Sequence, residues 1–146
     1  MVSHDNFKES SPAVHAHLGI IQAVIQRMAS NSSSCKAWCI TLVSAVLVIV
    51  ADKGKPNYAW IAAIPTILFL VLDAYYLGLE KGFRDSYNSF IEKLHHGRIQ
   101  PSDLYAVAPS GDVIVQFFAS LFSFAVWPFY LTLFLMIYLA KSVVLQ

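Results

Sequence analysis

The stretch "FLVLDAYYLGLEKGFRDSYNSF", residues 69–90, decides the fold of this chain. It begins as an apolar run and ends as a charged segment with aromatic residues, and Asp73 lies where one becomes the other. Apolar residues keep helical spacing beyond Asp73 until Gly97 and Pro101, which are signals for the end of a helix. We therefore predict one long helix that leaves a membrane and continues into water.

Composition supports a membrane location. Apolar residues make up 57% of the 146 residues and charged residues only 13%, whereas soluble domains carry about 25% charged residues. A soluble fold of this size cannot hide so much apolar surface, because small domains have a high surface-to-volume ratio. The formal net charge of +1 excludes a general attraction to nucleic acid. The composition predicts an all-α polytopic membrane protein.

Three apolar runs predict about three transmembrane helices. The first, residues 37–51, has 15 uncharged residues, and it reaches the roughly 20 needed to cross if Lys36 extends to the headgroups. The second is residues 58–79, and the loop between them holds Gly54 and Pro56, which predicts an antiparallel hairpin. The third, residues 113–140, has 28 residues without a charge and is expected to tilt or to kink at Pro128.

A separate amphipathic helix is predicted before the first span. It begins at Ser11 and Pro12, and residues 30–34, "SNSSS", are expected to bend the chain into the membrane. Its apolar seam is expected to pack on the extension of the second span. The predicted segments are 1–34, 35–79, 80–112 and 113–146. The seam consists of Val14, Leu18, Ile21, Ile25 and Met28, and its expected partners are Phe83, Tyr87 and Ile91.

The distribution of lysine and arginine predicts the orientation. Three spans place seven of these residues on the side of the N-terminus and three on the other side. Cytoplasmic loops carry the excess of such residues. We expect the N-terminus in the cytoplasm and the C-terminus outside. The three are Lys53, Lys55 and Lys141.

No residue pattern typical of an enzyme is present, and we expect neither a catalytic site, a cofactor nor a metal. His15 and His17 lie on different faces of a helix and are interpreted as surface residues. Cys35 and Cys39 share one helix face and are interpreted as small packing residues.

Polar residues inside the spans are the first candidate functional residues. Asp73 is interpreted either as a hydrated residue at the membrane surface, or as a polar pore mouth or an inter-helix hydrogen bond. Thr41 and Ser44 share one face of the first span. The third span carries a polar stripe that lines an aqueous path or joins helices. The stripe consists of Gln116, Ser120 and Ser123.

A local basic patch is the second candidate site. It either binds the phosphates of a nucleotide or nucleic acid, or serves only as the positive flank of a cytoplasmic segment. The patch consists of Lys93, His95, His96 and Arg98.

The segment "LDAYYLGLEKGFRDSY", residues 72–87, resembles the junction motif "LDAYYLRLERLFRxLY" of the SLATT family of bacterial membrane proteins. Gly78 and Gly82 depart from the motif, and the third span is an addition to the family's two-span pattern. The matching residues are Asp73, Tyr75, Tyr76, Leu79, Glu80, Phe83, Arg84 and Tyr87.

This resemblance implies a pore-forming effector of anti-phage defence, similar to the membrane channel of a Hailong-type system. It implies a homo-oligomer in the bacterial inner membrane, for which we expect four subunits. It also implies a regulator, a nucleotide or single-stranded nucleic acid made by a partner nucleotidyltransferase. The alternative is a membrane-anchored scaffold or sensor that binds a partner protein and conducts nothing.

Overall fold

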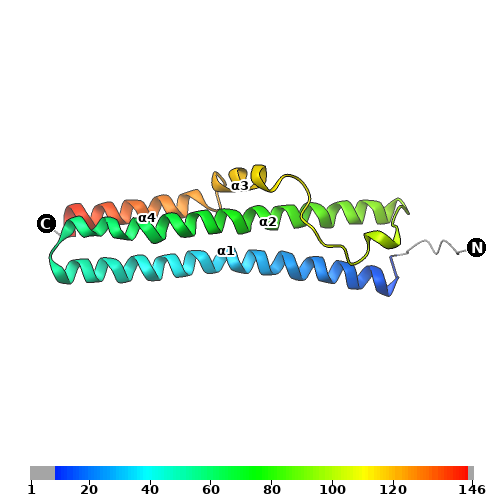
Figure 1. Cartoon of the computed structure of the whole chain (residues 1–146), viewed down its shortest axis with the longest axis horizontal. Helices are drawn as coiled ribbons and strands as arrows, with labels where there is room; N and C mark the ends of the chain where they lie inside the picture. The colour runs from blue at the N-terminus through cyan, green and yellow to red at the C-terminus, as the bar shows by residue number, and fades with distance from the viewer. Residues whose placement is uncertain (1–8, 145–146) are drawn as a thin grey trace, which may run out of the picture.

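The computed structural model describes residues 9–144, which are helical and contain no strand. Two long helices run antiparallel: α1, Pro12–Lys53, and α2, Ala63–His95 (Figure 1). The 3-10 helix η1, Pro56–Ala62, joins them at one end. Gly54 ends α1 by adopting a left-handed φ of 60°, which glycine reaches without strain. The predicted all-α fold and the glycine-containing hairpin are confirmed.

Helix α1 runs through residues 30–34 without interruption, and the predicted bend there is wrong. Its 42 residues form a rod about 63 Å long at about 1.5 Å per residue. Serine and asparagine lower helix propensity by less than about 0.7 kcal/mol each, so packing overrides them. Ser32 and Cys35 are buried in this part of the rod. The expected boundary at residue 34 therefore does not interrupt the backbone.

Helix α2 continues past Asp73 to His95, and Gly97 follows with a left-handed φ of 62°. The N-terminal part of α1 lies beside this extension. Val14 packs against Phe90 and Leu94, which are buried. Phe90 and Leu94 are thus partners of the seam, and the expected partner Tyr87 lines one pocket with Ile25. The expected partners Phe83, Tyr87 and Ile91 are only partly buried.

Residues 113–140 form two helices rather than the single third span that was predicted. α3, Val113–Leu121, and α4, Trp127–Leu139, are separated by a turn, and the π-helix η3, Ala140–Val144, follows. Pro128 lies in the first turn of α4, where its missing N–H breaks no helical hydrogen bond. The chain thus breaks before the proline rather than kinking at it. Among the described residues, two helices are long and apolar enough to cross a membrane.

The bundle has two halves along its length (Figure 1). In the apolar half, residues 37–72 and 126–144, α4 packs along the hairpin, and large apolar side chains such as Val48 and Ile64 are exposed. In the polar half, residues 12–36 and 73–112, residues 98–112 pass over the two long helices; we call this segment the strap. The core of the apolar half consists of Cys39, Val43, Ala62, Val126, Tyr130, Leu133 and Ile137.

Candidate functional site

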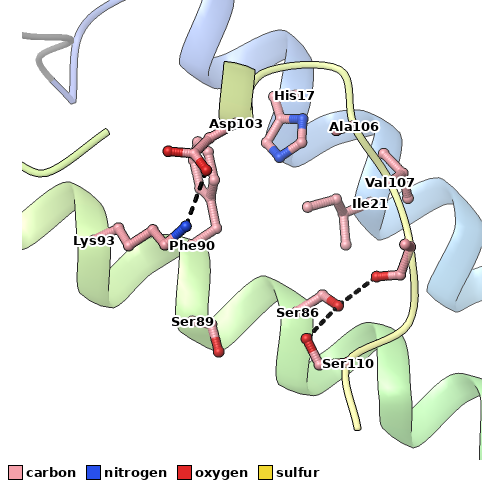
Figure 2. Close-up of a pocket in the computed structure, with 11 residues that line it drawn as sticks. His17, Ile21, Ser86, Ser89, Phe90, Lys93, Asp103, Ala106, Val107 and Ser110 are labelled. Atoms are coloured by element: carbon pink, nitrogen blue, oxygen red, sulfur yellow. Dashed lines mark hydrogen bonds and ion pairs between the residues drawn. The ribbon is translucent and has the colours of Figure 1, made fainter. Parts of the chain in front are cut away.

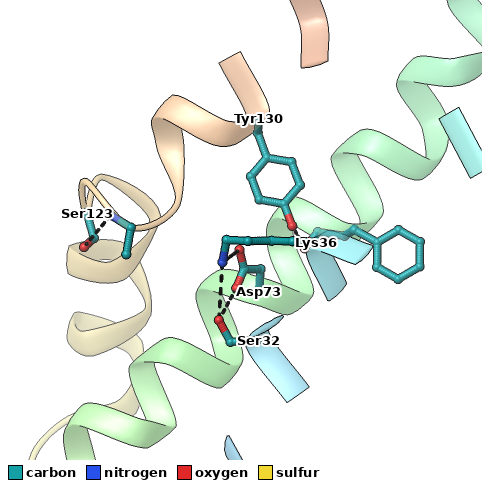
Figure 3. Close-up of polar contacts among 7 residues, drawn as sticks. Ser32, Lys36, Asp73, Ser123 and Tyr130 are labelled. Carbon is teal, nitrogen blue, oxygen red and sulfur yellow. Dashed lines mark hydrogen bonds and ion pairs between the residues drawn. The ribbon is translucent and has the colours of Figure 1, made fainter. Parts of the chain in front are cut away.

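A cluster of polar side chains lies where the two halves meet, and we call Ser32, Lys36 and Asp73 the boundary cluster. Figure 3 shows the Lys36 ammonium and the Ser32 hydroxyl converging on the Asp73 carboxylate. Lys36 Nζ lies 2.6 Å from Oδ2, and Ser32 Oγ donates to Oδ1 at 2.5 Å. Ser32 and Lys36 are four residues apart on α1 and so share the face toward α2. The cluster joins the two long helices by charge.

The burial of Asp73 excludes one of its two interpretations. Its side chain is 0% exposed, so Asp73 is not a hydrated surface residue. Lys36 is 25% exposed and turns inward to Asp73, so the prediction that it extends to the headgroups is wrong. The carboxylate is part of an inter-helix contact and does not lie on an open face. Nearby, Tyr130 donates to the carbonyl of Phe69 at 3.0 Å and fastens α4 to α2 (Figure 3).

Helix α3 docks on two glycines of α2, Gly78 and Gly82, which we call the glycine step. A Cβ atom on Gly78 would lie 3.2 Å from the backbone of Gln116. One on Gly82 would lie 2.9 Å from the Cβ atom of Pro109. The Ser110 amide donates to the Gly82 carbonyl at 3.0 Å. Two segments of backbone therefore approach closely here, and a larger side chain would separate them.

The predicted polar stripe of the third span faces this contact. Ser120 is fully buried, and Gln116 Nε2 donates to the Ser110 carbonyl at 2.9 Å and to Asp85 at 3.4 Å. Ser123 lies in the turn before α4, where its carbonyl accepts from the amides of Val126 and Trp127. Gln116 thus joins α3 to α2 and the strap, Ser123 bonds within its own turn, and the buried Ser120 hydroxyl has no hydrogen-bond partner among the described residues.

A cavity of about 210 Å³ lies in the polar half between α1, α2 and the strap (Figure 2). Lys93 binds Asp103 of the strap at 2.9 Å. Ser86 donates to the carbonyl of Ala108 at 2.6 Å, and its hydroxyl lies 2.9 Å from that of Ser110. These contacts fasten the strap to α2 and close the cavity on one side.

His17 fastens the strap to α1, and its interpretation as a surface residue is wrong. The residue is 1% exposed, and Nδ1 accepts the amide N–H of Tyr105 at 2.9 Å. Its ring packs on Phe90 with the ring centroids 4.4 Å apart. One signal in the sequence pointed to this burial: His17 lies three residues after Val14 and four before Ile21, on the same seam.

Burial and the charges at the strap act in opposite directions on the pKa of His17, and burial has the larger effect. Burial lowers the pKa of His17 below its ordinary value of 6.5, and the negative charge of Asp103 offsets part of this effect. The pKa of Asp103 is itself lowered by the Gln100 amide, which donates to its carboxylate, and by Lys93. Asp103 and Lys93 are the charged groups that line the cavity with His17.

We expect the strap to loosen as the pH falls from about 7.5 to about 5.5. The neutral ring is the form that accepts the Tyr105 N–H, and the pKa of His17 is lowered in the folded chain. The contact is therefore complete above pH 6.5 and weakens as the pH falls below this value. Hydrogen exchange of the Tyr105 amide, corrected for its intrinsic pH dependence, measures the loss of protection.

The matched control is His17→Gln, because a glutamine amide oxygen accepts a hydrogen bond and does not titrate in this range. In this variant the Tyr105 amide is expected to show the same protection at both pH values. Equal protection of the unchanged protein at both pH values contradicts the prediction.

The structure divides the predicted basic patch. Lys93 lines the cavity and is paired with Asp103, whereas the other three residues are exposed beyond it. His95 lies 3.8 Å from the Glu9 carboxylate, and His96 Nδ1 lies 2.7 Å from the carbonyl of Glu92. The exposed part of the patch, which includes Arg98, lies at the end of the bundle.

Thr41 and Ser44 are exposed on α1 in the apolar half. Ser44 lines a groove of about 510 Å³ between α1 and α4, and Thr132 of α4 lines the same groove. Thr41 and Thr132 each donate to the carbonyl four residues earlier, at 2.9 and 2.8 Å. Thr41 shares a face of α1 with Ser44, three residues later, and the other residues that line the groove are apolar; we call Thr41, Ser44 and Thr132 the hydroxyl face.

Comparison with known proteins gave no match: no family model, no curated protein and no solved structure is similar to this chain. The SLATT-like resemblance therefore stays a prediction.

Proposed function

We propose that this chain is the subunit of a homo-oligomeric ion channel in the bacterial inner membrane, a pore-forming effector of anti-phage defence. The observation that carries the proposal is the hydroxyl face. Its groove, about 510 Å³, lies within a surface that is otherwise suited to lipid. Thr41 and Thr132 already donate to backbone carbonyls, but a hydroxyl keeps acceptor capacity that water or a neighbouring subunit can use and acyl chains cannot. So few helices cannot surround an aqueous path while satisfying every backbone group, so conduction requires several copies.

The proposed orientation has the polar half in the cytoplasm. Lys53 and Lys55 flank the hairpin turn, and Lys141 lies 5.4 Å from the ring centroid of Trp60 at the same end. These three are the minority cations of the sequence. The positive-inside tendency then favours a cytoplasmic location for the other end, which carries Arg27, Lys93 and further cations.

The proposed gating signal is a nucleotide or single-stranded nucleic acid made by a partner nucleotidyltransferase, which rests on the SLATT-like resemblance. The exposed residues His95, His96 and Arg98 offer cationic or titratable groups for phosphate at the end of the bundle. The strap begins at Arg98 and continues into α3 and α4. The strap thus connects the proposed ligand-binding end of the bundle directly to the helices of the apolar half.

The channel function is tested first by inducing expression in cells that carry a membrane-potential dye. We expect the dye to report depolarisation when the pore opens, whether binding of the signal or its removal opens it. The purified protein is then recorded in planar bilayers. Ser44→Leu is expected to reduce single-channel conductance several-fold, because it places a bulky apolar group on the hydroxyl face.

The matched control is Ala45→Leu, the same bulk on the next residue of α1, which points about 100° away around the helix. It is expected to conduct like the unchanged protein. Unchanged conductance of Ser44→Leu excludes this face from the path. No conductance under any condition supports the non-conducting scaffold instead.

A further inference from the structure

Helix α3 is amphipathic in the opposite sense from a helix on a water-soluble protein. Its polar side faces inward, where Ser120 is fully buried and Gln116 bonds to the strap. Its outer side is apolar and open to the surroundings. Ile114 is 67% exposed and Phe118 is 54% exposed, and Phe122 in the following turn is 76% exposed. Contiguous exposed apolar surface of this kind is a sign of a missing partner.

The position of α3 along the bundle indicates the partner. The first apolar run of 15 residues covers only about 22 Å, whereas the hydrocarbon core is about 30 Å thick. The shortfall of about 8 Å corresponds to about five helical residues. Lys36, which precedes the first run, pairs with Asp73, so the count on α2 starts at Asp73. Five residues further along α2 is Gly78. This is the level at which α3 docks. The exposed side of α3 therefore continues the apolar surface of the adjoining half.

We propose that the outer face of α3 and its following turn contacts the acyl chains of the cytoplasmic leaflet. The proposal rests on the membrane location proposed above. The bilayer, rather than another protein, is the partner because the apolar side chains are continuous with the apolar half and lie beside its boundary. The glycine step then has a physical purpose: it lets the polar side of α3 dock closely enough for the outer side to meet lipid. On the side of the bundle that carries α3, the boundary cluster then lies below the lipid headgroups.

The test uses nitroxide spin labels on the full chain in vesicles of phosphatidylethanolamine and phosphatidylglycerol. Single cysteines replace Phe118 or Phe122 in a background in which Cys35 and Cys39 are alanine. Power saturation compares the accessibility of each label to oxygen, which concentrates in lipid, with its accessibility to a water-soluble nickel complex. Leu68→Cys, an exposed position of the apolar half, is the lipid control, and Asn88→Cys, exposed in the polar half, is the water control.

Labels at Phe118 and Phe122 are expected to favour oxygen over nickel to the same degree as the Leu68 label. Nickel accessibility like that at Asn88 overturns the proposal, and so does low accessibility to both reagents, which indicates cover by a second copy. If the Leu68 label also reads as water-exposed, the membrane location fails. If Leu68 reads as lipid and the α3 labels do not, only the inference about α3 fails. The two labelled positions serve as independent readings, so one poorly folded variant does not leave the question open.

Discussion

Lys36→Met is expected to lower the free energy of unfolding by about 3–5 kcal/mol, the typical effect of removing one partner of a buried ion pair. Asp73 is 0% exposed, and the Lys36 ammonium at 2.6 Å neutralises its charge. Without this ammonium the carboxylate keeps only the Ser32 hydroxyl and is buried as a lone charge. Reversible unfolding of the detergent-solubilised protein by sodium dodecyl sulfate measures the change.

The double variant Lys36→Met, Asp73→Leu is the informative control. Removing both charges leaves no unpaired group, so this variant is expected to be more stable than Lys36→Met alone. Lys53→Met, at an exposed position at the end of α1, is expected to unfold like the unchanged protein. A Lys36→Met variant as stable as Lys53→Met shows that the pair contributes nothing to the α1–α2 contact.

Gly78→Leu is expected to detach α3 from α2 and to lower the free energy of unfolding by about 1–3 kcal/mol, as overpacking typically does. The first added atom would already lie 3.2 Å from the backbone of Gln116, and backbone yields less easily than a flexible side chain. The remaining atoms of the leucine side chain must also fit into this contact, so we expect the contact to open. Limited proteolysis in the strap and α3 reports the detachment, and unfolding gives the free energy.

Gly19→Leu provides the comparison. Gly19 is exposed within α1, and no atom lies within 4 Å of the position of its added Cβ. Leucine is a better helix former than glycine, so this variant is expected to be at least as stable as the unchanged protein. If Gly78→Leu resists protease as well as Gly19→Leu does, the glycine step is not the docking point of α3.

The long helices were predictable because their signals are local and strong. The predictions of a continuous helix after Asp73, of its end at Gly97 and of a turn at Gly54 are confirmed. Each depends on residues adjacent in sequence. The serines of residues 30–34 were misread for the same reason, since local propensity there is overridden by packing against α2.

The broken third run and the buried histidine required knowledge of distant contacts. Hydropathy alone does not distinguish one 28-residue span from α3, a turn and α4, because all are apolar. The burial of His17 depends on Tyr105, 88 residues later. The pairing of Asp73 with Lys36 likewise depends on the register of two helices. The charge of each residue is evident from the sequence, but the contact between them is not.

The two departures from the SLATT-like motif have a structural explanation. Gly78 and Gly82 are the positions at which α3 approaches α2, and α3 belongs to the segment that the two-span pattern lacks. A long side chain at either position would occupy the space that α3 fills. In the predicted resemblance, the two glycines and the additional segment therefore belong to one contact.

The unbroken course of α1 has a mechanical consequence. A rod without a hinge transmits rotation along its whole length, so a force on its N-terminal end moves the opposite end as a lever does. A tilt of about 5° about the boundary cluster moves a point about 30 Å away by roughly 2.6 Å, which is close to the width of a water molecule. The serines in the middle of the rod thus form no bend that would absorb the motion.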